Sequence, residues 1–206
     1  MSLETELNKS LISVIYHLSG TCKELADALE KAEKETLTDG LTGLLNRKGF
    51  TNIKHNISGK TPWQVAVVDI DYFKKYNDDF GHFEGDKALM MVANNLDTIA
   101  KTYTLIGVET HAVRWGGEEF VIVTKGTPQD ISDISEHLCK TMPQKTISLP
   151  RSITVSIGCA QMLWPDWTTG LKLADERLYQ AKLAGRNRVV NGSEAIEINS
   201  VVVNSF

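Results

Sequence analysis

The first 36 residues carry apolar side chains at the spacing of a coiled-coil seam. Apolar positions recur at steps of three and four, the period with which two helices bury a shared stripe. Two successive steps of four make a stutter, which locally unwinds a supercoil. The seam runs through Leu7, Leu11, Val14, Leu18, Cys22, Leu25, Leu29 and Ala32. Two interpretations stay open, a single amphipathic helix folded against the rest of the chain and a helix that pairs with a second copy; no other sequence feature offers a partner, which favours pairing.

Beyond the turn residues Thr38-Asp39-Gly40 the pattern changes to that of a compact α/β region. The run 63–70 (WQVAVVDI) is continuously apolar and follows Pro62, which predicts a buried central strand. Two extended segments flank Gly116-Gly117, a pair typical of a tight hairpin. The other predicted strand is 152–160, the hairpin strands are 111–115 and 118–124, and the predicted helices are 46–57, 72–79, 84–101, 129–142 and 168–184.

The core order is therefore strand, helix, strand, strand, helix, strand. This order is typical of the ferredoxin-like α+β class, in which helices pack on an antiparallel sheet. We divide the chain into an N-terminal helix at 1–36, one domain at 37–191 and a tail at 192–206. The tail has alternating apolar residues that are compatible with an added edge strand, and we assign it no role.

Composition and charge narrow the function classes. The formal net charge of −4 argues against a general nucleic-acid binder, although a local basic cluster can still hold nucleotide phosphates. Three widely spaced cysteines form no pair typical of zinc sites or disulfide frameworks. No apolar run reaches the roughly 20 residues that span a bilayer, and the first residues do not read as a signal peptide. We expect a cytoplasmic protein without a membrane segment.

The end of the predicted central strand carries two carboxylates, Asp69 and Asp71. Hard cations such as Mg²⁺ favour one or two carboxylates together with substrate phosphates. Asp69 is placed where a buried sheet opens to solvent, which suits a ligand. For Asp71 we favour the simpler interpretation that it caps the helix that follows.

The segment Arg114–Phe120 combines a glycine pair with two carboxylates. Gly116 and Gly117 let the backbone approach a ligand closely, because they carry no Cβ. If the hairpin lies beside the central strand, Glu118 can reach the same cation as Asp69. Glu118 and Glu119 are expected to differ in orientation, since adjacent strand residues point to opposite faces. A glycine hairpin with acidic neighbours is in itself usually only a hairpin.

Two further stretches offer groups that suit a nucleotide. Lys74 can meet phosphate, and Asn77 with Asp86 matches the donors and acceptors at the edge of guanine. Lys182 and Arg186 can converge on a polyphosphate near the end of the last helix. The alternatives are ordinary turn residues in the first stretch, with a hydrogen-bonding His82, and a solvated helix end in the second.

These stretches, in this order, resemble the GGDEF family of diguanylate cyclases. The resemblance covers about residues 37–190. Its pieces are Asp39-Gly40-Leu41-Thr42-Gly43-Leu44 with Asn46-Arg47, Asp69-Ile70-Asp71-Tyr72-Phe73-Lys74, Asn77-Asp78, Gly81-His82, Gly85-Asp86, Arg114-Trp115-Gly116-Gly117-Glu118-Glu119-Phe120, Thr154-Val155-Ser156-Ile157-Gly158 and the block from Ala174-Asp175 to Asn187. It implies the cyclase-palm form of the ferredoxin-like sheet.

The resemblance also implies residue roles. Asp69, the carbonyl of Ile70 and Glu118 hold Mg²⁺, with Mn²⁺ as an alternative, and Glu119 is the candidate base for the ribose 3′-hydroxyl. The implied catalytic residues are Glu119, Glu118 and Asp69. The implied substrate-binding residues are Asn77, Asp86, Lys74, Phe73, His82, Arg114, Gly116, Gly117, Lys182 and Arg186.

The activity that the resemblance implies is condensation of two GTP molecules into cyclic di-GMP. Each domain binds one GTP, so two copies must meet, which gives a pairing N-terminal helix a purpose and links it to an upstream sensor. Many members carry an inhibitory Arg-x-x-Asp before the signature, whereas Gly107-Val108-Glu109-Thr110 stands here, so we expect no product inhibition through that site. The alternative function is a catalytically silent GTP-binding regulatory module.

Overall fold

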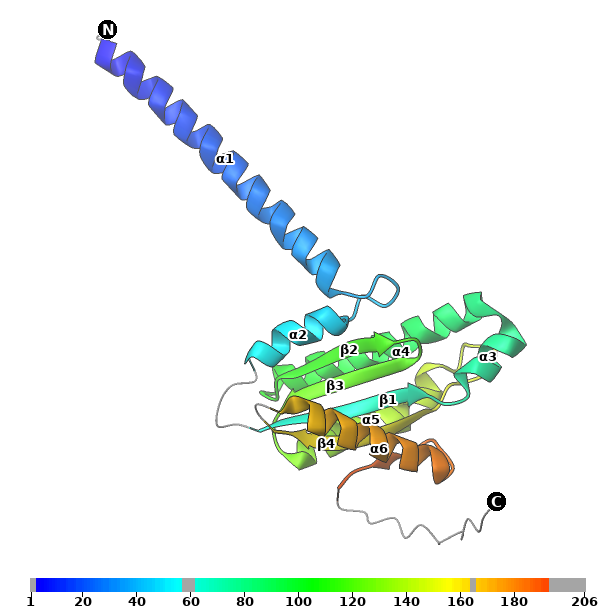
Figure 1. Cartoon of the computed structure of the whole chain (residues 1–206). Helices are drawn as coiled ribbons and strands as arrows, with labels where there is room; N and C mark the ends of the chain where they lie inside the picture. The colour runs from blue at the N-terminus through cyan, green and yellow to red at the C-terminus, as the bar shows by residue number, and fades with distance from the viewer. Residues whose placement is uncertain (1–2, 57–61, 164–165, 193–206) are drawn as a thin grey trace, which may run out of the picture.

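The computed structural model describes residues 3–56, 62–163 and 166–192. A long N-terminal helix extends away from a domain of helices and one sheet (Figure 1). The helices are α1 (Leu3–Leu37), α2 (Arg47–Asn56), α3 (Phe73–Phe80), α4 (His82–Leu105), α5 (Pro128–Lys145) and α6 (Trp167–Leu183). The strands are β1 (Trp63–Ile70), β2 (Thr110–Gly116), β3 (Glu119–Lys125), β4 (Val155–Met162) and β5 (Val189–Val190).

The strands form a five-stranded sheet in the order β2-β3-β1-β4-β5. The central strand β1 is antiparallel to both β3 and β4, and the short β5 lies parallel to β4. The predicted α+β fold and its order of elements are confirmed. An additional edge strand was considered for the tail, but residues 193–206 lie outside the part of the chain that the structure describes.

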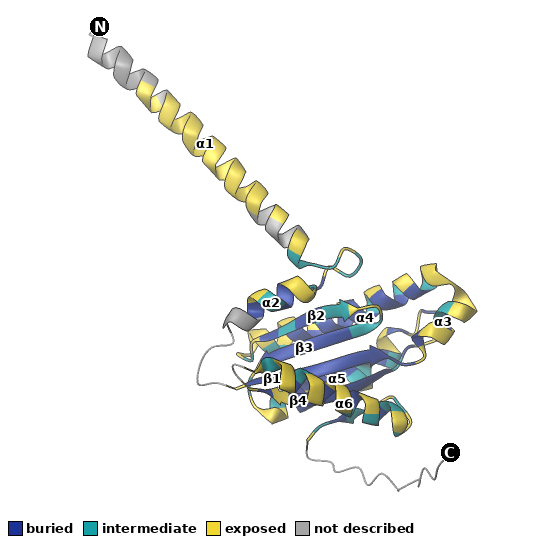
Figure 2. Cartoon of the chain, viewed as in Figure 1, coloured by how far each residue is buried: buried dark blue, intermediate teal, exposed yellow. Residues whose placement is uncertain are grey.

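The alternation of side chains along β1 divides the core into two layers. Ala66, Val68 and Ile70 pack with α4 and α5 on one face of the sheet. Val65 and Val67 pack with α2 and α6 on the other. All eight residues of β1 are buried, and the strands beside it are largely dark blue in Figure 2. Asp69 follows Val65 and Val67 in this alternation, so it faces α6.

Several element boundaries differ from the expected ones by a few residues. Helix α4 continues to Leu105 rather than ending at 101, because no glycine interrupts it before Gly107, which has φ 96°. The hairpin turn contains Glu118, since Gly116 pairs with Glu119 and two residues connect them. Strand β4 covers Val155–Met162 instead of 152–160.

Helix α1 exposes its apolar residues to solvent. Leu11, Val14 and Leu18 are between 53% and 57% exposed, and Leu25 is 75% exposed. The interpretation that this helix folds against the domain is therefore wrong; pairing with a second copy stays a prediction. The end of α1 is nevertheless tied to the domain, because the amide of Asn46 donates to the carbonyls of Thr36 and Thr38 at 3.0 and 2.8 Å.

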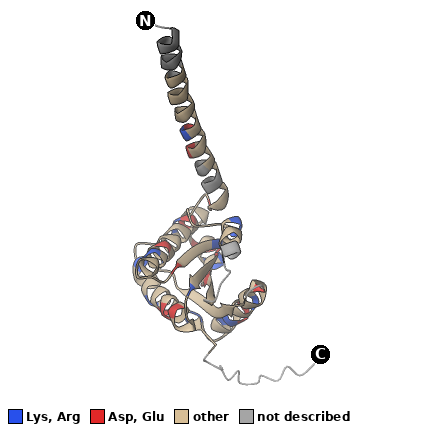
Figure 3. Cartoon of the chain, turned by 90° about the vertical axis from the view of Figure 1, so that its left-hand side faces the viewer, with Lys and Arg blue, Asp and Glu red and all other residues tan. Residues whose placement is uncertain are grey.

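The surface of the domain carries charges of both signs. In the view of Figure 3, positions with Lys or Arg are interspersed with positions with Asp or Glu along the ribbon. Among the described residues, no helix is both long and apolar enough to cross a membrane.

Candidate active site

Asp69 is a nearly buried carboxylate at the end of β1. Its side chain is 10% exposed, and one oxygen lies 2.9 Å from Nζ of Lys182 on α6. Burial raises the pKa of Asp69; the ammonium of Lys182 opposes this rise, and repulsion from Glu118 and Glu119 adds to it. The strand thus holds an acidic group where negative charge is unfavourable unless a cation is nearby.

The hairpin β2–β3 places two more carboxylates beside Asp69. Glu119 pairs directly with Asp69 across the antiparallel strands, and residues in such pairs share a face of the sheet. Glu118 precedes β3 in the turn, and its carbonyl lies 3.4 Å from the backbone N of Ile70. Gly117 has φ 51°, a left-handed conformation that glycine adopts without strain. Glu118 and Glu119 differ in position, although through the turn rather than by strand alternation.

Arg114 links the hairpin turn to the loop that follows α1. Its guanidinium donates to the Gly117 carbonyl at 2.9 and 3.2 Å and to the Asp39 carboxylate at 2.9 Å. Burial acts to raise the pKa of Asp39, but hydrogen bonds from Thr42 and Arg114 outweigh it and hold that pKa below its ordinary value. We expected Arg114 in the substrate site; here it connects the loop after α1 to the glycine turn.

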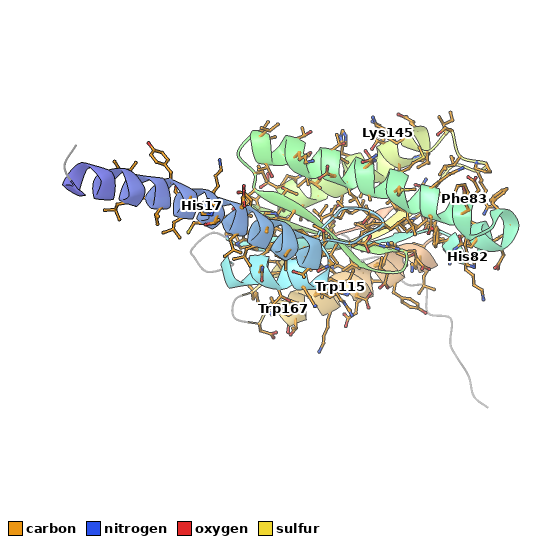
Figure 4. The ribbon with its side chains drawn as sticks, turned by 90° about the horizontal axis from the view of Figure 1, so that it is seen from above. His17, His82, Phe83, Trp115, Lys145 and Trp167 are labelled. Carbon is orange, nitrogen blue, oxygen red and sulfur yellow. The ribbon has the colours of Figure 1, made fainter. Side chains whose placement is uncertain are left out.

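An aromatic cluster supports the base of the hairpin. The register shifts between Arg114 and Gly116, which leaves Trp115 as a bulge. Phe50 of α2 meets both Trp115 and Trp167 edge-on, with ring centroids 5.3 and 5.2 Å apart. The two tryptophans are labelled in Figure 4. Helices α2 and α6 therefore hold the bulge in place.

The carboxylates at this corner fit a divalent cation. Asp69 and Glu118 carry hard oxygen atoms that could serve as ligands, and the Ile70 carbonyl is adjacent in sequence. The raised pKa of Asp69 reflects, after burial, mutual repulsion that a bound cation would relieve. Within the described ranges, no three Asp, Glu, His or Cys side chains are grouped to hold a metal by themselves. A site with two carboxylates and substrate phosphates needs no such group.

Helices α3 and α4 meet closely where guanine recognition is expected. A Cβ at Gly85 would lie 1.8 Å from Oδ1 of Asn77, so any side chain at position 85 would displace the Asn77 amide. That oxygen is buried and accepts no hydrogen bond from the described residues. Asp86 is exposed on the next position of α4, and Phe73 is buried beneath Asn77 and Gly85. An orphaned acceptor beside an open carboxylate suits a ligand that offers N–H donors.

The remaining predicted residues are distributed around this corner. Lys74 is exposed on α3 one turn before Asn77. His82 is exposed at the start of α4, one turn before Asp86, and Figure 4 shows it beside Phe83. Arg186 lies after α6, with its guanidinium 4.4 Å from the ring centroid of Tyr72.

The role expected for Asp71 as a helix cap is wrong. Tyr72 occupies the capping position of α3, and no side chain caps that helix. The carboxylate of Asp71 instead accepts hydrogen bonds from the hydroxyls of Thr154 and Ser156 and from the backbone N of Asn187. These three donors outcompete the helix N-terminus. The contacts of Asp71 and Tyr72 were not predicted from the sequence, because their partners lie more than 80 positions away.

Comparison with known proteins gives one family. The sequence profile described as "Diguanylate cyclase, GGDEF domain" matches residues 36–188. Diguanylate cyclase DgcM of Escherichia coli K12 is 34% identical over 191 residues, which cover 89% of this chain and 44% of that protein. Response regulator PleD of Caulobacter vibrioides is 34% identical over 179 residues, 81% of this chain and 38% of PleD. The chain therefore spans less than half the length of these relatives.

A solved structure shows the same arrangement of domain and helix. The coiled coil and GGDEF domain of DgcB from Caulobacter crescentus, in complex with c-di-GMP, superposes with a TM-score of 0.72 at 29% identity. The match covers 92% of this chain and 99% of that one.

Proposed function

The chain belongs to the GGDEF family of diguanylate cyclases, and from this premise we propose that it condenses two GTP molecules into cyclic di-GMP and two pyrophosphates. The observation that carries the proposal is the corner formed by β1 and the β2–β3 hairpin. There Asp69 lies 2.9 Å from the ammonium of Lys182, Glu119 pairs with Asp69 across the strands, and Glu118 lies in the adjoining turn. The glycine turn leaves room for a nucleotide at these carboxylates.

The metal in this proposal is Mg²⁺, with Mn²⁺ as the alternative. Asp69, Glu118 and the Ile70 carbonyl would hold it. Bound there, the cation neutralises charge on the triphosphate and on the three carboxylates. Lys182 adds a further positive charge beside Asp69.

Different side chains are assigned to the phosphates and to the base. We assign Lys74, Lys182 and Arg186 to the phosphates, since each presents a cation from the elements around Asp69. Asn77 and Asp86 read guanine, because a carboxylate accepts from both N1–H and the 2-amino group, which adenine does not present together. The buried acceptor of Asn77 supports this assignment.

The chemical step joins two nucleotides bound to two copies. Glu119 accepts the proton of the 3′-hydroxyl of one GTP as that oxygen bonds to the α-phosphorus of the other. The bond from the α-phosphorus to the bridging oxygen breaks, and pyrophosphate leaves. The same exchange at the second pair of groups closes the ring. Positioning and charge neutralisation supply the acceleration, without a covalent protein intermediate.

Assembly of two copies is the role we propose for α1. Its exposed Leu11, Leu18 and Leu25 would bury one another in a parallel coiled coil and hold two domains at high effective concentration. The contacts from Asn46 and Arg114 connect the end of α1 to the glycine turn, which gives an upstream sensor a route to the site.

Incubation of the full chain with GTP and Mg²⁺, followed by chromatography, tests the proposal. We expect cyclic di-GMP and pyrophosphate in a ratio of one to two, with specific activity that falls on dilution. Tight GTP binding without product would instead identify a silent regulatory module. Added cyclic di-GMP should not inhibit the enzyme by binding at residues 107–110, where the inhibitory Arg-x-x-Asp of other members is missing. Binding of the product there at micromolar concentration would contradict this expectation.

A further inference from the structure

The segment after α6 has an unusual backbone. Gly185, Arg186 and Asn187 have φ angles of 108°, 64° and 47°, three consecutive residues in the left-handed half of the map. Asparagine adopts such angles fairly readily, but arginine does so only with steric strain, so the surrounding structure must hold Arg186 there. This segment carries Arg186, one of the cations assigned to the phosphates.

Asp71 makes the contact that holds the segment 185–187 in this conformation. Its side chain is buried, with the residue 6% exposed, and one oxygen accepts the backbone N–H of Asn187 at 3.0 Å. That oxygen also accepts from the Thr154 hydroxyl at 2.7 Å, and the other accepts from Ser156 at 2.6 Å. The two hydroxyls lie at the start of β4, so the carboxylate joins the sheet to the segment that follows α6.

The residue next to Asp71 continues the same support. Tyr72 also has a left-handed φ of 58°, which leaves its ring 60% exposed beside Arg186. The guanidinium of Arg186 lies 4.4 Å from that ring centroid and 3.3 Å from the tyrosine hydroxyl. Asp69 pairs with Lys182 two residues earlier. The end of β1 and the residues before α3 thus make three contacts with the end of α6 and the segment that follows it.

We propose that Asp71 is a positioning residue for GTP binding, which acts by fixing the left-handed turn at 185–187 so that Arg186 meets the phosphates. The proposal rests on the proposed function for the identity of the ligand. Asp71 itself touches neither GTP nor metal in this scheme. Its effect on affinity should therefore depend on the presence of the Arg186 side chain.

A double-mutant cycle tests this dependence. The affinity of the full chain for α,β-methylene-GTP, which cannot release pyrophosphate, is measured by calorimetry with Mg²⁺ for Asp71→Ala, Arg186→Ala and the pair. We expect Asp71→Ala to weaken binding about tenfold in the parent and less than twofold in the Arg186→Ala background, because contacts that act through one group are not additive. An equal loss in both backgrounds would overturn the proposal.

Two further variants guard against simple misfolding. Asp71→Asn keeps one acceptor for the Asn187 N–H, while its amide can donate to the Ser156 hydroxyl, so it should recover most of the lost affinity. Thr154→Val removes a hydrogen bond from the same carboxylate oxygen but leaves the Asn187 contact, and should change affinity less than twofold. Loss of affinity in Thr154→Val as large as in Asp71→Ala would indicate general loosening and contradict the specific role.

Hydrogen exchange separates this proposal from the proposed function. The backbone amide of Asn187 should exchange at least tenfold faster in Asp71→Ala, whether or not nucleotide is present. If the parent chain does not bind the analogue, the proposed function has failed. Unchanged exchange at Asn187 would independently refute the role of Asp71 in fixing the turn at 185–187.

Discussion

All eight residues of β1 are buried, whereas Leu25 and Leu29 of α1 are 75% and 61% exposed. Both segments are rich in aliphatic side chains, yet one completes its packing within the chain and the other does not. Burying a leucine fully contributes about 1.5–3 kcal/mol, so a stripe of such residues left in water favours association. The sheet domain therefore needs no second copy to form its core, while α1 does to bury its seam.

The proposed catalytic residues and the proposed dimerisation surface therefore lie in different regions of the molecule. The carboxylates, Lys182 and the residues that we propose to read guanine lie on the sheet domain, around the end of β1. The apolar stripe that would bring two such domains together lies on α1. Changes in either region should abolish product for different reasons, and the variants below distinguish those reasons.

The largest expected effect comes from Glu119→Gln. Glutamine keeps the size of the side chain but cannot take the proton of the 3′-hydroxyl, so turnover should fall by about a thousandfold or more. GTP affinity and the association of α1 should be unchanged. Product formation measured by chromatography, with affinity measured separately, checks this.

The matched control is Asp97→Asn on α4. Asp97 makes an exposed ion pair with Lys101. Because exposed ion pairs contribute little to stability, this substitution should leave turnover within twofold of the parent. Normal turnover in Glu119→Gln would show that another group accepts the proton.

The next effect concerns α1 alone. Leu18→Glu with Leu25→Glu places like charges along the seam, which should prevent pairing. At submicromolar enzyme, specific activity should fall between a hundred- and a thousandfold, because the effective concentration of the second site is lost. Raising the enzyme concentration should recover activity in proportion.

The control for this pair places the same charges elsewhere on the helix. Ser19→Glu with Ala26→Glu adds the same two glutamates beside the seam, at exposed positions. It should retain activity and its dependence on dilution. Equal losses in both pairs would mean that charge on α1, rather than its seam, controls the enzyme.

The two regions also differ in how far the sequence alone predicts them. The buried run of β1, the Gly116-Gly117 turn and the order of elements follow from local patterns, so the fold could be predicted. The partners of Asp71 and Arg114 could not, because Asn187 and Asp39 become neighbours only through the tertiary fold. The sequence pattern predicts that α1 is a helix. It does not predict whether the apolar stripe of this helix packs on its own domain, because that depends on where the chain leaves the helix in the tertiary fold.

A third test compares the cysteines of the two regions. Cys22 is exposed on α1, whereas burial raises the pKa of both Cys139 and Cys159 to about 11. The reactive thiolate forms only as the pH approaches that value, so at pH 7.5 these two thiols should react about a hundredfold more slowly than an ordinary exposed thiol. Labelling with a maleimide, located by mass spectrometry, should modify Cys22 first.

Labelling of Cys139 as fast as Cys22 would mean that the contact between α5 and the segment at 185–187 opens readily, because the Cys139 sulfur lies 3.6 Å from Oδ1 of Asn187. Denaturant should make all three thiols react at similar rates. Mild oxidation should also link Cys22 to Cys22 of a second copy, if the seams are in register.

The smallest effect is one of selectivity within the sheet domain. Asp86→Ser removes the carboxylate that accepts from two N–H groups of guanine, and the preference for GTP over ATP should fall about tenfold, since hydrogen-bonded readout is lost while stacking and phosphate contacts remain. Adenine-containing product, measured with both nucleotides present, reports the change, and Asp133→Ser on the exposed side of α5 is the control. The shift in preference should be the same in chains with an intact seam and with the charged seam at high enzyme concentration. A shift that depended on the seam would mean that base selection takes place between the two copies and not within each one.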